Sequence, residues 1–177
     1  MLSITKTNSQ NLDFLRLVEA RDKELAIRNG DANDFFAQYN KVDFINYVIV
    51  AYNNDIPVGC GAIKEYDDTT MEIKRMYVSQ EMRGYGIAHK ILSALEAWAH
   101  DLGFTCCILE TGDDMFPAVS LYKKCGYIKI PNYGQYVDVT DSVCFAKYIL
   151  HPQQSIMLQN VQIKSYLCPS KININGR

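Results

Sequence analysis

The sequence predicts an α+β fold in which one mixed sheet is combined with helices. β-Branched strand patterns in a hairpin series occupy residues 47–78, and alternating strand and helix patterns follow them. No internal repeat divides the chain. The length of 177 residues suits one compact domain, which we expect over residues 1–150, and a hydrophobic share of 48% is enough for a core.

The first half of the chain shows strand and helix patterns in succession. Leu2–Thr7 has a strand pattern, and the apolar stripe from Leu12 to Leu25 predicts a helix that ends near Gly30. Aromatic residues at 35–39 predict a second, short helix. Strands follow at Tyr47–Tyr52, Val58–Ile63 and Met71–Val78, with tight turns at Asn53–Asp55 and Asp67–Thr70.

The second half alternates between strands and helices. An apolar stripe at helical spacing runs from Ile87 to Leu102, and Gly103 closes this helix. The remaining predicted elements are a strand at Cys106–Leu109, a helix from Pro117 to Cys125 that Gly126 stops, and a last strand at Val143–Leu150. Residues 151–177 are rich in Gln, Asn and Ser and contain no acidic residue. We expect them to be an extension: a tail, an added edge strand or a homodimer arm.

Charge and cysteine usage exclude several classes of protein. The formal charge is −2 and the pI about 5.9, so no overall basic field is present to hold a nucleic acid. No apolar run approaches the ~20 residues of a membrane span, and the amino terminus lacks a secretory pattern. Six cysteines without a C-x-x-C pair predict reduced thiols, no bound metal and a cytoplasmic location.

The most informative segment is the loop Arg83-Gly84-Tyr85-Gly86-Ile87-Ala88, which joins a strand to an amphipathic helix. Helix starts leave about four backbone N–H groups unpaired and carry partial positive charge. Glycines let this backbone approach a ligand closely. The loop therefore predicts a pyrophosphate site, although such a segment is also common as an ordinary turn.

Two other phosphate motifs fit this loop poorly. A dinucleotide site wants a third glycine, which is missing here, although Asp101 and Glu110 leave its acidic residue formally available. A nucleotide P-loop wants Gly-Lys-Ser or Gly-Lys-Thr, which is absent. Neither motif explains the segment.

The loop and three other segments resemble the GNAT superfamily of acyl-CoA N-acyltransferases. Its signature, Arg/Gln-x-x-Gly-x-Gly/Ala, is matched by Arg83, Gly86 and Ala88. The other matching segments are Val58–Ala62, Glu72–Val78 and Leu121–Tyr127, within a resemblance that covers Val48–Leu150. It implies a twisted, mostly antiparallel sheet of about six or seven strands, about four flanking helices and one splayed strand pair.

The strand before the loop has an irregular pattern that the resemblance explains. Ile73, Met76 and Val78 step by three and then by two, which strict alternation forbids and a one-residue bulge repairs. In the family this bulged strand pairs with the pantetheine arm of acetyl-CoA. The residues expected to bind acetyl-CoA are Met76, Tyr77, Val78, Arg83, Gly84, Tyr85, Gly86, Ile87 and Ala88.

The resemblance implies acetyl transfer from acetyl-CoA to a primary amine, by direct attack in a ternary complex and with a small-molecule amine favoured. Tyr122, in Leu-Tyr-x-x-x-Gly-Tyr, is the candidate general acid for the leaving thiolate, unless it only packs. Glu72 is the first candidate base, with Glu110 or water as alternatives. We expect Glu110, Tyr133 and Tyr136 to bind the acceptor, unless the tyrosines only pack in a solvated turn. The acidic residues Asp67, Asp68, Glu72 and Glu110 predict that this acceptor is a cationic amine.

One departure from the family pattern concerns Met115. Many members have Asn at this place before the last helix, so a side-chain hydrogen bond to pantetheine is in doubt. Two other functions stay open from the sequence: a non-catalytic module that binds acyl-CoA, and an acetyltransferase that acts on a protein amine.

Overall fold

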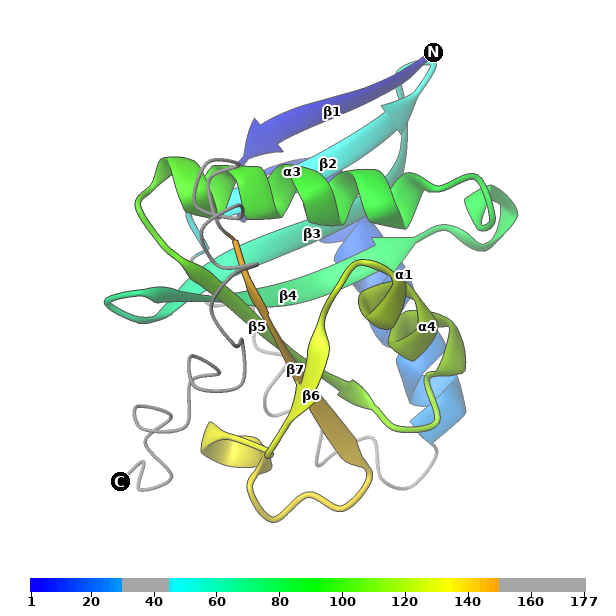
Figure 1. Cartoon of the computed structure of the whole chain (residues 1–177). Helices are drawn as coiled ribbons and strands as arrows, with labels where there is room; N and C mark the ends of the chain where they lie inside the picture. Colours follow the sequence, from blue (N-terminus) through cyan, green and yellow to red (C-terminus); the bar gives the residue numbers. More distant parts are fainter. Residues whose placement is uncertain (30–44, 150–177) are drawn as a thin grey trace. The chain divides into compact units, whose positions relative to one another are not determined.

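A computed structural model of the chain describes residues 1–29 and 45–149. Seven strands form one sheet in the order β1-β2-β3-β4-β5-β7-β6, and the described residues contain three α-helices (Figure 1). The predicted α+β class is confirmed, with parallel and antiparallel pairs in one sheet. The short helix expected at 35–39 and the extension 151–177 lie outside the described residues.

Contacts divide the chain into two compact units. Unit 1 comprises Met1–Glu65 and Ile73–Trp98, and unit 2 comprises Tyr66–Glu72 and the chain from Ala99 onward. The elements that begin in unit 1 are β1 (Leu2–Thr7), α1 (Leu12–Asn29), β2 (Tyr47–Asn53), β3 (Ile56–Asp67), the 3-10 turn η3 (Gln80–Met82) and α3 (Ile87–Asp101). Strand β4 (Thr70–Val78) begins in unit 2 and ends in unit 1.

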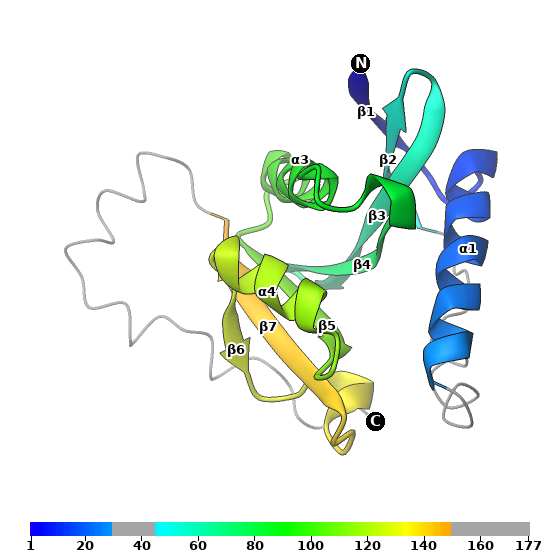
Figure 2. The ribbon, with the colours of Figure 1, turned by 90° about the vertical axis from the view of Figure 1, so that its right-hand side faces the viewer.

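In unit 1, the two helices cover opposite faces of the strands (Figure 2). Strands β1, β2 and β3 are antiparallel neighbours. The α1 face holds one apolar cluster, to which the helix contributes Phe14, Leu17 and Val18 and the strands contribute Val48, Val50, Cys60 and Ala62. From Glu19 to Arg28 the residues of α1 are half-buried or exposed. The hydrophobic anchor of α1 is therefore confined to its first half.

The two turns predicted between these strands are present. Asn54 and Asp55, between β2 and β3, have φ of 48° and 65°, the left-handed pair that a two-residue hairpin loop requires. The Asp67 carboxylate accepts from the backbone N–H of Thr69 at 2.9 Å, which closes the turn before β4.

Strand β4 carries the irregularity that the sequence predicts. Arg75 is only 5% exposed and has a φ of 58°. This left-handed conformation is uncommon for residues other than glycine. Beyond it, the side chains of Met76 and Val78 face α3, close to Gly61 and Gly59, while Tyr77 packs against the α1 cluster. Arg75 therefore lies where the strand changes phase, as a bulge does.

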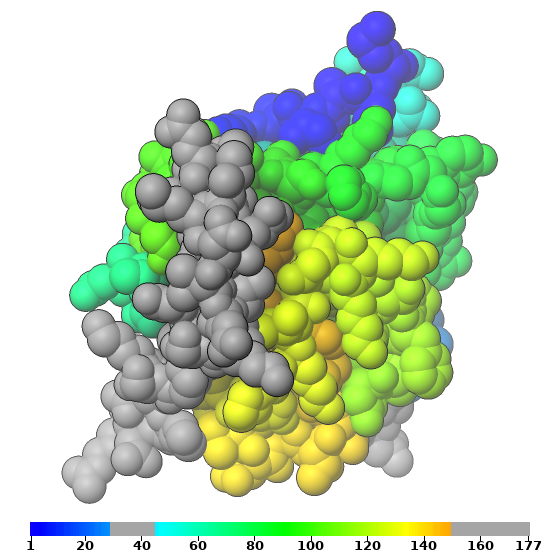
Figure 3. Space-filling view, viewed as in Figure 1, coloured from blue at the N-terminus to red at the C-terminus, as the bar shows by residue number. Residues whose placement is uncertain are grey.

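Unit 2 is built on the beginning of β4 together with β5 (Cys106–Gly112), α4 (Phe116–Lys124), β6 (Ile128–Ile130), the 3-10 turn η4 (Gly134–Tyr136) and β7 (Ser142–Tyr148). Strand β7 pairs antiparallel with β5 along its length and with β6 at its other edge. In the space-filling view, α4 and the stretch from β6 to η4 form one continuous surface (Figure 3). The three-residue β6 is too short to stand out from the sequence.

Strands β4 and β5 pair over three rows only. They are parallel, and their paired residues are Thr70 with Cys106, Met71 with Cys107 and Glu72 with Ile108. Both strands continue beyond the Glu72 row. This early end of the ladder is the splayed strand pair expected from the resemblance.

Candidate functional site

The glycine loop before α3 has the backbone geometry of an anion site. Gly84 and Gly86 have φ of 85° and 75°, and a Cβ built on either residue would meet no atom within 4 Å. The glycines are therefore required for backbone conformation, and the space beside them is open. The backbone N–H of Lys90 donates to the Gly86 carbonyl at 3.2 Å. The backbone N–H groups before Lys90 therefore lie ahead of the hydrogen-bond ladder of α3. Tyr85, between the glycines, is 71% exposed.

Arg83 makes contacts within unit 1 that its sequence motif does not suggest. Its Nε donates to the Val78 carbonyl at 3.0 Å, and its Nη2 donates to both carboxylate oxygens of Glu24 on α1 at 2.8 and 2.7 Å. The guanidinium also lies 5.8 Å from the centre of the Tyr77 ring. The Glu24 hydrogen bond raises the pKa of Arg83, and the Arg83 hydrogen bond lowers the pKa of Glu24.

The strand segment expected to face pantetheine follows the last β4–β5 pair. Met76, Tyr77 and Val78 all lie beyond the row of Glu72 and Ile108. Along these three residues, β4 is no longer paired with β5. Whether they bind the donor stays a prediction.

The predicted acceptor residues lie together on one face of the unit 2 sheet. The Tyr133 hydroxyl donates to Glu72 Oε1 at 3.0 Å, and the Ser142 hydroxyl donates to Glu110 Oε1 at 2.5 Å. Glu72 pairs with Ile108, and Glu110 follows two residues later, so both carboxylates project from the same face. Tyr136 stacks edge-on against Tyr133, with ring centres 5.8 Å apart.

Burial and negative charge shape the electrostatics of this face. Burial raises the pKa of Tyr133 well above its usual value, and the Glu72 charge adds to the effect. The pKa of Tyr136 is raised by burial and then by Glu110 and Glu72. Burial also raises the pKa of the Cys144 thiol to about 12. The phenols and the thiol are therefore neutral beside two carboxyl groups at neutral pH.

Tyr122 lies on the opposite face of the same sheet. It is 5% exposed, and its ring centre is 6.2 Å from that of Phe145 on β7 and 5.8 Å from that of Tyr127. Phe145 pairs with Leu109, one residue before Glu110, so these rings project away from the carboxylate face. The candidate acid and the candidate base thus approach the sheet from opposite sides.

Two contacts of predicted site residues could not be read from the sequence. Ser142 holds Glu110 from 32 residues away, and Glu24 holds Arg83 from 59 residues away. Neither partner has a local motif. Tyr133 was expected to face the acceptor, and the structure places it 1% exposed, with its hydroxyl on Glu72.

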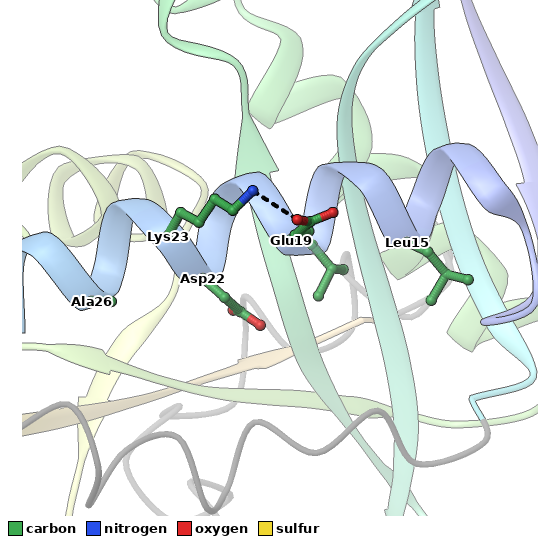
Figure 4. Close-up of a pocket in the computed structure, with 6 residues that line it drawn as sticks. Leu15, Glu19, Asp22, Lys23 and Ala26 are labelled. Atoms are coloured by element: carbon green, nitrogen blue, oxygen red, sulfur yellow. Dashed lines mark hydrogen bonds and ion pairs between the residues drawn. The ribbon is translucent and has the colours of Figure 1, made fainter.

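An open hollow on unit 1 has no predicted site residue in its lining. Its lining comes from α1 alone, namely Leu15, Val18, Glu19, Asp22, Lys23 and Ala26 (Figure 4).

Within the described ranges no helix has the length and apolar character needed to cross a bilayer. Residues 1–29 and 45–149 also contain no group of three or more His, Cys, Asp or Glu side chains arranged to hold a metal ion.

Comparison with known proteins gives related sequences. The model of the acetyltransferase (GNAT) family matches residues 13–127, which is more than half of the chain. An IAA acetyltransferase of Azospirillum brasilense is 34% identical over 89 residues, covering 50% of this chain and 58% of that protein. The uncharacterized N-acetyltransferase YsnE of Bacillus subtilis is 32% identical over 99 residues, covering 55% and 66%. The chain thus spans less than two thirds of the length of these curated relatives.

Solved structures share the fold over most of this chain. A Klebsiella pneumoniae protein assigned as an acyl-CoA N-acyltransferase has a TM-score of 0.71 at 27% identity, covering 85% of this chain and 99% of its own. An Elizabethkingia anophelis GNAT acetyltransferase with acetyl-CoA bound has a TM-score of 0.62 at 16% identity, covering 83% and 97%. The match to the family model, the strand order and the glycine loop before α3 agree: the chain belongs to the GNAT family of acetyltransferases.

Proposed function

We propose that this protein transfers the acetyl group of acetyl-CoA to a primary amine, with a small cationic amine as acceptor. The observation that carries this proposal is the unit 2 sheet, which has Glu72 and Glu110 on one face and Tyr122 on the other. Family membership supports the donor. Glu72 and Glu110 support the acceptor class, because a carboxylate pair attracts a protonated amine.

The donor is held, in this proposal, by the glycine loop and the end of β4. The backbone N–H groups from Gly84 to Ala88 bind the pyrophosphate, and their geometry supports this because the loop is open at the start of α3. Met76–Val78 offer backbone groups to the pantetheine arm. Arg83 and Tyr85 complete the proposed donor site.

The reaction is a direct displacement. The neutral amine nitrogen attacks the thioester carbon, a C–N bond forms and the C–S bond breaks. Before attack, Glu72 accepts the proton that the bound ammonium must lose, directly or through water, and the hydrogen bond from Tyr133 fixes its carboxylate. The second proton of the nitrogen passes to water as the amide forms. Tyr122 donates a proton to the leaving thiolate from the other face. Glu110, held by Ser142, binds the positive charge of the acceptor before attack.

The acceptor class is tested by offering a panel of amines with acetyl-CoA and measuring acetylated products by mass spectrometry. We expect cationic small amines to exceed neutral aromatic amines in kcat/KM. Glu110→Gln should raise the KM for the cationic acceptor about tenfold, because it removes the charge that holds it. Asp138→Asn, an exposed change beyond η4, serves as control and should leave KM unchanged.

The results also separate the other two functions. Acetylation of peptide amines with none of the small ones would replace the small-molecule acceptor with a protein amine. Tight binding of acetyl-CoA without any acetylated product would leave a binding module and would overturn the enzyme proposal.

A further inference from the structure

Helix α1 is fixed to unit 1 in two different ways along its length. Its buried residues, Phe14, Leu17 and Val18, all belong to the first half. From Glu19 to Arg28 no residue is buried. In this second half, Glu24 is the residue whose carboxylate takes both hydrogen bonds from Arg83 Nη2. A polar contact therefore joins the second half of α1 to the residue that opens the glycine loop.

The guanidinium of Arg83 joins three segments of unit 1. Its Nε bond to the Val78 carbonyl closes the stretch between the end of β4 and the loop. Its bonds to Glu24 reach α1, and its Cζ lies 5.8 Å from the centre of the Tyr77 ring. Gln80, in η3, also lowers the pKa of Glu24. These contacts fix the backbone immediately before Gly84.

We infer that Glu24 and Arg83 form a positioning pair that holds the glycine loop in the conformation that binds the donor pyrophosphate. This inference rests on the proposed function and gives Arg83 an indirect role. Its charge is already matched by the Glu24 carboxylate, at 2.7 Å for the closer oxygen. The backbone N–H groups then bind the anion, and the ion pair fixes where they point.

Two roles for Arg83 predict opposite effects of the same substitution. If Arg83 positions the loop through Glu24, Glu24→Gln weakens CoA binding as Arg83→Gln does, by about fivefold each. The double variant is then no weaker than either single variant, since both remove one contact. If Arg83 instead grips the pyrophosphate directly, Glu24 competes for it, and Glu24→Gln strengthens CoA binding.

The chain offers a matched control on the same helix. Glu19 pairs with Lys23 at 2.7 Å, and both side chains are exposed (Figure 4). Glu19→Gln removes one carboxylate from α1 as Glu24→Gln does, but leaves the loop contacts in place. Both pairs are solvent-accessible, so neither substitution should unfold the protein.

The experiment measures the Kd of CoA by calorimetry for these variants, together with amide hydrogen exchange across residues 83–88 in the ligand-free protein. We expect faster exchange in Glu24→Gln and Arg83→Gln, unchanged exchange in Glu19→Gln, and weaker CoA binding in the first two alone. Glu24→Gln should lose less activity with S-acetylpantetheine, which lacks the pyrophosphate, than with acetyl-CoA. Loop exchange identical to wild type, or tighter CoA binding by Glu24→Gln, would overturn the inference. A wild type that binds no CoA would refute the proposed function, and the exchange data would still decide the role of the pair.

Discussion

Burial, more than neighbouring charge, sets the protonation of several single side chains. Burial raises the pKa of the Cys60 thiol in unit 1 and of the Cys144 thiol in unit 2 to about 12. It also raises the pKa of Tyr133 and Tyr136 above that of a free phenol. All four groups stay protonated in the folded state at pH values where an unfolded chain would ionise them.

Stability should therefore fall as pH rises from about 8.5 to 12. In this window the unfolded thiols lose protons that the folded thiols keep. The unfolded state then binds fewer protons, and the free energy of unfolding decreases by about 1.4 kcal/mol per pH unit for each such group. Denaturant unfolding between pH 7 and 11 measures this slope.

Two thiol substitutions make the test specific. Cys60→Ala should make the slope shallower by one proton, because it removes one buried titrating group. Cys144→Ala should make the slope shallower by a similar amount, because burial raises the pKa of this thiol to about 12 as well. A free energy of unfolding that stays constant from pH 9 to pH 11 would contradict the explanation.

At the scale of elements, the close approach of α3 to β3 depends on glycine. A Cβ built on Gly61 would lie 2.6 Å from Met76 Sδ and 2.9 Å from Ile91 Cγ2 and Leu95 Cδ1. Interatomic contacts this short do not occur in packed interiors, so Gly61 lets the helix that begins at the glycine loop lie directly on the strand. The height of α3 above the sheet is thus fixed by a residue without a side chain.

Gly61→Ala should destabilise the protein by about 1–3 kcal/mol through overpacking. Thermal unfolding measures the loss. In a Met76→Ala background, Gly61→Ala should destabilise the protein less than it does in the wild type, because the nearest obstructing atom, Met76 Sδ, is then absent. An unchanged melting temperature for Gly61→Ala would mean that α3 shifts without cost and that Gly61 does not fix its height.

The elements also show which features a sequence can predict. Three features depend on residues that are close together in the chain: the glycine loop, the tyrosine of α4 and the bulge at Arg75. For the loop and the bulge, the spacing of nearby residues predicted the backbone geometry. The bonds from Tyr133 to Glu72 and from Arg83 to Glu24 join residues 61 and 59 positions apart. Only the tertiary fold brings such partners together, so local patterns could nominate Glu72 and Arg83 but not their contacts.

At the scale of the whole molecule, each unit carries a different part of the proposed chemistry. Unit 1 has the open glycine loop and the released end of β4, which suit a phosphate-bearing donor. Unit 2 has a carboxylate face for an amine and Tyr122 on the reverse face for a leaving thiolate. Strand β4 runs through both units, and its pairing with β5 ends at Glu72.

The most direct test of this account is the release of CoA thiol from acetyl-CoA in the presence of a cationic amine, compared between wild type and Tyr122→Phe. We expect the wild type to release thiol in step with acetylated amine. Tyr122→Phe should lower kcat about 100-fold while CoA still binds, because the ring contacts with Tyr127 and Phe145 persist and only the proton donor is lost. Tyr127→Phe, in the same aromatic cluster, should retain kcat. Equal turnover by wild type and Tyr122→Phe would remove Tyr122 from the reaction, and no amine-dependent thiol release by the wild type would contradict the central claim.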